Sequence, residues 1–171
     1  MFIKTKQLVC SLLSFNYKLH CFFKKPKIIV TKNYTWHDKV VLIVEDDVSS
    51  LMLLKAILSK TGAKVIIAED GETAVDLVQS NMHIDLILMD IRLKGLSGLE
   101  ATQLIKQIKP STPVIAQTAC AILGDMEKCL DAGCNAYISK PIESSTLLET
   151  MDYYFKRNVA QDLLDTIMFA N

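Results

Sequence analysis

Polar side chains end four short apolar runs of the sequence, and together their types could handle a phosphoryl group. They are the acidic run Glu45-Asp46-Asp47, the single Asp90, the hydroxyl of Thr118, and Lys140 with Pro141. Apolar runs of this length are typical of buried parallel strands. The carboxyl ends of such strands meet at one edge of the sheet, where open α/β sheets bind their ligands. Carboxylates, a hydroxyl and an ammonium gathered there would suit a divalent cation and a phosphoryl group.

Strands and helices that alternate along the chain must position these residues. The apolar runs predict strands at 40–45, 64–68, 84–89, 113–118 and 136–139. Helical spacing and stop signals predict helices at 48–60, 71–80, 98–108, 122–132 and 143–157. A strand–helix unit repeated about five times indicates the α/β class, with one parallel sheet covered by helices on both faces.

The first of these helices illustrates the signals. Leu51, Leu54 and Leu58 lie at helical spacing and form one apolar face, and Gly62 follows as a stop signal. We expect Asp47 to lie at the start of this helix, where an acidic side chain is favourable, rather than to bind a metal ion.

Charge is unevenly distributed along the 171 residues. The whole chain has 19 Lys+Arg and 19 Asp+Glu, but residues 1–36 contain seven Lys and no acidic residue. The remainder therefore carries 19 − 7 = 12 basic against 19 acidic residues, a formal charge of −7. An acidic balance argues against nucleic-acid binding by the main domain.

The cysteines and the hydropathy indicate in which cellular compartment the protein is expected. The five cysteines form no CxxC pair and have no zinc-ligand spacing, which favours free thiols in a reducing cytoplasm. No apolar run is long enough to predict a membrane span. We expect a cytoplasmic protein, associated with a membrane only indirectly or through its basic leader.

Three segments are expected. Residues 1–37 form a basic leader, poorly ordered, weakly helical or left over from a larger protein. Its start is similar to a secretory signal but lacks a clear cleavage site, and binding to a membrane surface stays open. Residues 38–157 form the compact domain, with half of the whole chain hydrophobic. Residues 158–171 form a short extra helix or a linker.

From about Lys39 to Phe155 the sequence resembles the receiver domain of two-component response regulators. The stretches that carry the resemblance are VLIVEDD, DLILMDIRLKGLSGLEA, TPVIAQTA and DAGCNAYISKPI, in this order and at matching spacing. The sequences of the last two stretches are most similar to those of receivers attached to hybrid sensor kinases. The resemblance implies a flavodoxin-like, doubly wound (βα)5 fold with strand order 2-1-3-4-5.

The resemblance also implies a role for each of the polar residues. Asp90 would be the phosphoacceptor, and Mg²⁺, with Mn²⁺ as an alternative, would be the cofactor. Asp46 and Asp90 would bind the ion directly, Glu45 through water, and Arg92 through its main-chain carbonyl. The Arg92 side chain, two positions after Asp90, would affect the loss of the phosphoryl group.

Further residues would sense the phosphoryl group. Lys140 would pair with Asp90 at rest and with a phosphoryl oxygen afterwards, and the bond from Lys140 to Pro141 is often cis in this family. Thr118 would move toward the phosphoryl group, next to the small Ala119, and Tyr137 would turn inward in response. Gly95 and Gly98 fit a tight loop and a helix start.

The sequence thus predicts a phosphoacceptor that switches partner binding through its fourth helix, fifth strand and fifth helix. No histidine of the chain fits the donor role, so a histidine kinase or histidine phosphotransfer protein, or a small acyl phosphate, would supply the phosphoryl group. Leu51 and Met52 on the first helix are candidate kinase contacts. Such a domain is no enzyme beyond its own phosphorylation and slow dephosphorylation.

Two alternative functions share parts of this pattern. A pseudo-receiver would bind partners without phosphorylation, but all the residues for the chemistry are present. A phosphatase with an aspartate nucleophile usually has a second aspartate two positions later, where this chain has Arg92. The downstream partner and the choice between a stand-alone protein and a piece of a hybrid kinase stay open.

Overall fold

The computed structural model describes residues 32–80, 82–119 and 123–169. The expected basic leader therefore lies outside the described residues, apart from its last few positions. The chain divides into two units, Met1–Lys32 and Asn33–Asn171, and the second contains the described helices and strands. None of the described helices is both long and apolar enough to cross a membrane.

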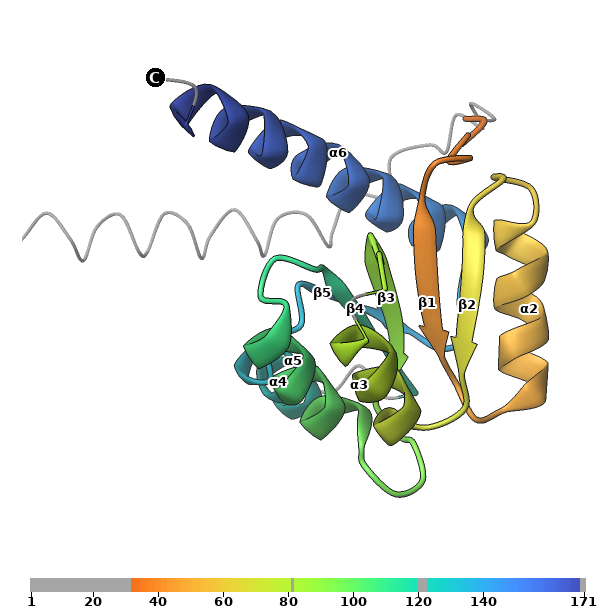
Figure 1. The fold of residues 1–171 in the computed structure, drawn as a ribbon. Helices are drawn as coiled ribbons and strands as arrows, with labels where there is room; N and C mark the ends of the chain where they lie inside the picture. Colours follow the sequence, from red (N-terminus) through yellow and green to blue (C-terminus); the bar gives the residue numbers. More distant parts are fainter. Residues whose placement is uncertain (1–31, 81, 120–122, 170–171) are drawn as a thin grey trace, which may run out of the picture. The chain divides into compact units, whose positions relative to one another are not determined.

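A single sheet of five parallel strands forms the centre of this unit (Figure 1). The strands are β1 (Val40–Val44), β2 (Lys64–Ala68), β3 (Leu86–Asp90), β4 (Val114–Thr118) and β5 (Ala136–Ser139). Their order is β2-β1-β3-β4-β5, and every neighbouring pair is parallel. The α/β class and the 2-1-3-4-5 order expected from the sequence are confirmed.

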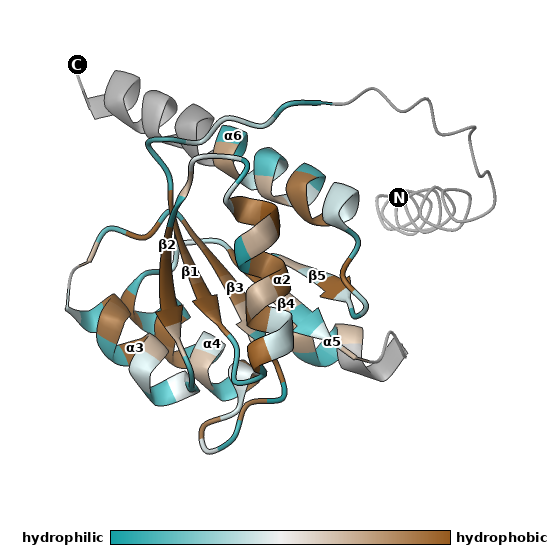
Figure 2. Ribbon diagram, turned by 90° about the vertical axis from the view of Figure 1, so that its right-hand side faces the viewer, coloured by the Kyte–Doolittle hydropathy of each residue, from teal (hydrophilic) through white to brown (hydrophobic). Residues whose placement is uncertain are grey.

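Helices cover both faces of the sheet. They are α2 (Val48–Leu58), α3 (Gly71–Gln79), α4 (Gly98–Ile108), α5 (Leu123–Asp131) and α6 (Ser144–Phe169). One apolar core lies between the sheet and helices α3, α4 and α5, and a second lies between the sheet and helices α2 and α6. The central strands β1 and β3 are apolar, as Figure 2 shows, apart from Asp90 at the end of β3, because both of their faces are covered.

Side chains next to the helix starts fix where the helices begin. Asp47 caps α2 by accepting a hydrogen bond from the backbone N–H of Ser50 at 2.7 Å, as its expected position at a helix start requires. Ser97 and Glu100 form a reciprocal capping box at the start of α4. These caps satisfy N–H groups that the helices leave unpaired, and they set the entry of each helix beside the end of the preceding strand.

The packed part of the chain begins before the expected domain start at residue 38. Trp36 is buried in the core under α2 and α6, and its ring lies 4.9 Å from that of Phe155. Its backbone N–H donates a hydrogen bond to the carbonyl of Thr61 at 2.7 Å. The last helix differs as well, because α6 runs without interruption to Phe169 instead of ending near residue 157.

Cys129 and Cys134 are buried, and neither forms a disulfide with another described residue. Burial, together with the neighbouring Cys129, raises the pKa of Cys134 to about 11. Its thiol is therefore a small apolar group of the core at neutral pH. The other three cysteines, Cys10, Cys21 and Cys120, lie outside the described residues.

Candidate functional site

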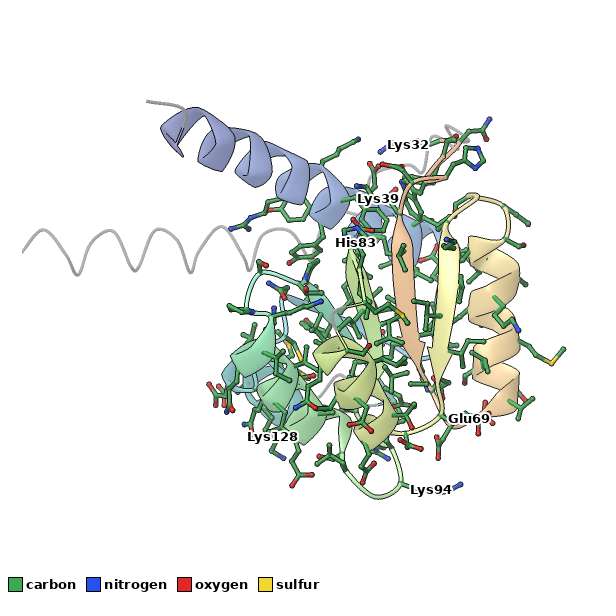
Figure 3. All side chains as sticks on the ribbon, viewed as in Figure 1. Lys32, Lys39, Glu69, His83, Lys94 and Lys128 are labelled. Carbon is green, nitrogen blue, oxygen red and sulfur yellow. The ribbon has the colours of Figure 1, made fainter. Side chains whose placement is uncertain are left out.

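The predicted site residues lie at the carboxyl edge of the sheet. Glu45 and Asp46 follow the last residue of β1, and Asp90 is the last residue of β3. Thr118 ends β4 and Lys140 follows β5. The loop after β3 carries Lys94 at this same edge, whereas Lys39 and His83 lie at the opposite edge (Figure 3). The topology therefore brings together residues that are up to 95 positions apart in the chain.

Lys140 connects two of the carboxylates. Its ammonium donates to Asp90 Oδ2 at 2.6 Å, and to Glu45 Oε2 at 2.8 Å and Oε1 at 3.1 Å. The Glu45 side chain is fully buried and that of Asp90 is 9% exposed, and Lys140 is the cation paired with both. A buried carboxylate without a cation would be strongly disfavoured.

The pKa values of Glu45 and Lys140 reflect a balance between burial and their mutual hydrogen bonds. Burial raises the pKa of Glu45, and the hydrogen bond from Lys140 opposes that effect only in part. Burial alone would lower the pKa of Lys140, but its hydrogen bonds to Asp90 and Glu45 outweigh burial and raise it. The ammonium is thus held in its charged form between the two carboxyl groups.

A third carboxylate completes an oxygen cluster that fits a hard divalent cation. One oxygen each from Glu45, Asp46 and Asp90 can be chosen so that all lie within 4.8 Å of one another. The set contains carboxylates and no sulfur or imidazole, which matches the oxygen ligands that Mg²⁺ takes together with water. Lys94 contacts this cluster from the solvent side, since its exposed ammonium lies 3.4 Å from Asp46 Oδ2.

Backbone groups after β3 hold Asp90 in place. The backbone N–H of Arg92 donates to Asp90 Oδ1 at 2.8 Å, while the Arg92 residue itself is exposed. Gly98, the first residue of α4, approaches the strand so closely that a Cβ there would lie 1.9 Å from the carbonyl oxygen of Asp90. Gly95 has a φ of +73°, which fits the tight loop expected there.

The remaining predicted residues lie around β4 and β5. Thr118 is buried, whereas Ala119 directly after it is exposed. Tyr137 is half-buried against the core under α3, α4 and α5, and its register partner is Ala116, two positions before Thr118. The peptide bond between Lys140 and Pro141 is cis, and the Lys140 N–H donates to the carbonyl of Thr118 at 2.7 Å.

Two residues near the site, Lys94 and Gln117, were not predicted from the sequence. Lys94 lies in a loop where a lysine carries no distinctive signal. Gln117 lies one position before Thr118 and is fully buried, although neither its amide oxygen nor its amide nitrogen has a hydrogen-bond partner in the described structure. A glutamine inside an otherwise apolar strand is a signal that could have drawn attention to it.

Comparison with known proteins gives the same assignment for most of the chain. The family model described as the response regulator receiver domain matches residues 41–152. The polar-differentiation response regulator DivK of Brucella ovis is 42% identical over 118 residues, which are 68% of this chain and 95% of DivK. Hybrid signal transduction histidine kinase I of Dictyostelium discoideum is 40% identical over 120 residues, which are 66% of this chain and 7% of that kinase.

Solved structures with the same fold agree. The receiver domain of a sensor histidine kinase from Pseudomonas aeruginosa PAO1 is 35% identical, with a TM-score of 0.65, and the match covers 69% of this chain and 98% of that domain. That structure has a magnesium ion coordinated in its active site cleft. A CheY-like receiver domain protein from Methanospirillum hungatei JF-1 is 31% identical, with a TM-score of 0.67, and the match covers 72% of this chain and 98% of that protein.

Proposed function

The chain belongs to the family of response regulator receiver domains, signalling domains of two-component systems, and we propose that Asp90 is its phosphoacceptor. The single observation that carries this proposal is the contact of Asp90 with Lys140 at 2.6 Å inside a cluster of carboxylates. A carboxylate that is paired with an ammonium and lies next to a cation site can attack phosphorus.

In the proposed reaction, an oxygen of Asp90 attacks the phosphorus of a phosphohistidine or of a small acyl phosphate. The new bond joins this oxygen to phosphorus, and the bond from phosphorus to the donor's leaving atom breaks. The product is an aspartyl phosphate, and the leaving imidazole takes up a proton. Slow attack by water would later return the free Asp90 carboxylate and inorganic phosphate.

A bound cation and Lys140 would together lower the repulsion between Asp90 and the incoming phosphoryl group. Asp46 and Asp90 would hold Mg²⁺ directly, with Mn²⁺ as an alternative, while Glu45 would act through water and Arg92 through its carbonyl. The ion would supply positive charge to the phosphoryl oxygens. Lys140 would exchange its contact with the carboxylate of Asp90 for one with a phosphoryl oxygen. Its raised pKa, due to Asp90 and Glu45, supports this role.

The phosphoryl group would then change the surface formed by α5, β5 and α6. We propose that the Thr118 hydroxyl moves toward a phosphoryl oxygen next to Ala119, and that Tyr137 turns inward. Thr118 and Tyr137 belong to the same face of the sheet as Ala116, which supports a coupled movement. The Arg92 side chain would influence how fast the phosphoryl group is lost.

The phosphodonor would be a histidine kinase or a histidine phosphotransfer protein that docks on α2. Of the two candidate contacts, Met52 is 67% exposed, whereas Leu51 is half-buried against the core. Val48 is also exposed, at 69%, and begins α2 directly after the acidic run. This apolar strip next to the site supports docking there, with Met52 rather than Leu51 as the contact.

Intact mass after incubation with acetyl phosphate and MgCl₂ tests the proposal. We expect a gain of about 80 Da, the mass of one phosphoryl group, which requires Mg²⁺ and is absent in Asp90→Asn. A gain that persists in Asp90→Asn would show that another residue accepts the group. If neither acetyl phosphate nor a phosphohistidine protein labels the wild type, a pseudo-receiver that acts without phosphorylation becomes the better interpretation.

A further inference from the structure

Gln117 is a buried polar side chain for which the fold gives no structural reason. The residue has no exposed surface, and both polar atoms of its amide lack a hydrogen-bond partner among the described residues. Leaving a buried amide unpaired is unfavourable, and an apolar side chain of similar volume would avoid that loss. An uncompensated amide of this kind indicates a partner that the side chain acquires in another state.

The register of the sheet places Gln117 next to Asp90. In β4, Val114 and Ala116 belong to the core under α3, α4 and α5, whereas Ile115 belongs to the core under α2 and α6. Because side chains alternate along a strand, Gln117 faces the same side as Ile115. It pairs with Asp90 on β3 and with Ile138 on β5.

Lys140 has to cross β4 at this point. It follows β5, yet its ammonium reaches Asp90 on β3, and β4 lies between these two strands. Gln117 is the last residue of β4 on the face that carries Ile138, two positions before Lys140, and it is level with Asp90. Its amide is therefore next to the path that the Lys140 side chain takes to the carboxylates.

The present partners of Lys140 are also the candidate ligands of the cation. Among the described residues, Glu45 and Asp90 accept all the side-chain hydrogen bonds of Lys140, and both belong to the three-carboxylate cluster. A divalent cation held by this cluster would compete with the ammonium for the lone pairs of these carboxylates. When the cluster turns toward a cation, Lys140 needs another acceptor, and an ammonium has three N–H donors to satisfy.

We propose that Gln117 is a positioning residue for Lys140: in the cation-loaded site its Oε1 accepts a hydrogen bond from the Lys140 ammonium. This inference rests on the proposed function, because it assumes that the carboxylate cluster binds the cation used in phosphoryl transfer. The unpaired amide of the resting state is then an acceptor held ready beside Asp90. The hydrogen bond from Lys140 to Gln117 would keep the ammonium beside Asp90, within reach of an incoming phosphoryl group.

Gln117→Met is the sharpest test, because methionine has nearly the same shape and no comparable acceptor. Removal of an acceptor for a charged donor should weaken Mg²⁺ binding by roughly tenfold, as measured by calorimetric titration with MgCl₂. The free energy of unfolding without Mg²⁺ should stay the same or rise, since the variant no longer buries an unpaired amide. A merely structural role would lower that stability and leave the Mg²⁺ affinity unchanged, which would overturn the inference.

Measurements on the wild type keep the inference testable if the variant does not fold. The side-chain amide signals of Gln117 in NMR spectra should shift on titration with MgCl₂, and unchanged signals would refute its role. Labelling of Asp90 by acetyl phosphate separates the two hypotheses. Wild-type protein that neither binds Mg²⁺ nor becomes labelled contradicts the proposed function, whereas normal binding and labelling with an inert Gln117 contradict only this inference.

Discussion

Gly98 controls the position of Asp90 through close contact rather than through a side chain. A Cβ at this residue would lie 1.9 Å from the carbonyl oxygen of Asp90, and the three atoms nearest to it all belong to the backbone of Asp90 and Ile91. We expect Gly98→Ala to push α4 away from β3, to lower the free energy of unfolding by about 1–3 kcal/mol, and to slow labelling by acetyl phosphate. Urea unfolding and labelling rates measure the two effects.

Gly133→Ala is the matched control for this prediction. Gly133 has a φ of +94° and precedes β5, so the substitution is strained but lies at the opposite edge of the sheet from Asp90. It should lower stability by a similar amount without slowing the labelling of folded protein. Equal labelling rates for the two variants would show that the contact of Gly98 does not position Asp90.

At the scale of residues, sequence motifs located most of the candidate site. Glu45, Asp90 and Lys140 each end or follow an apolar run, and that position alone brings them to one edge of a parallel sheet. The contact of Lys94 with Asp46 could not be predicted in this way, because it depends on how the loop after β3 folds. The unpaired amide of Gln117 likewise depends on how Lys140 crosses β4.

At the scale of elements, substitutions on α2 can separate the docking of a phosphodonor protein from the phosphorylation reaction itself. Met52 is exposed and lies outside both cores, so Met52→Asp should change the free energy of unfolding by less than about 0.5 kcal/mol. A buried charge in the docked complex should slow transfer from a phosphorylated histidine phosphotransfer protein at least tenfold or so. Labelling by acetyl phosphate, which needs no docking, should keep its wild-type rate.

Leu130→Asp provides the comparison for Met52. Leu130 is 57% exposed and belongs to α5, away from α2. This variant should accept phosphoryl groups from the protein donor and from acetyl phosphate as the wild type does. Normal transfer to Met52→Asp, or equally slow transfer to both variants, would count against docking on this part of α2.

Element boundaries were predictable where a local signal marks them. The expected helix 98–108 and the expected strand 136–139 coincide with α4 and β5, since a capping box and a short apolar run define them. The third strand begins two residues later than expected, at Leu86, and just before it the Asp85 carboxylate accepts a hydrogen bond from the N–H of Val40. No glycine or proline follows residue 157, so nothing in the sequence marked an earlier end of α6.

At the scale of the whole molecule, the segment before β1 joins parts of the fold that are distant in the chain. The Trp36 ring packs edge-on against Phe155 of α6 and lies 5.3 Å from the ring of Tyr34. Its backbone N–H is bonded to Thr61, which lies between α2 and β2. One residue outside every helix and strand thus packs into the core between the sheet and helices α2 and α6.

Trp36 is the only tryptophan of the chain and is 5% exposed, so its truncation removes a large buried surface. We expect Trp36→Ala to lower the free energy of unfolding by about 3–5 kcal/mol, because α6 loses its contact with the segment before β1. Trp36→Phe keeps an aromatic ring against Phe155 and should lose less than half as much. Urea unfolding followed by circular dichroism measures both variants. If Trp36→Ala unfolds at the same urea concentration as the wild type, then the sheet alone holds α6, and the segment before β1 does not contribute to stability.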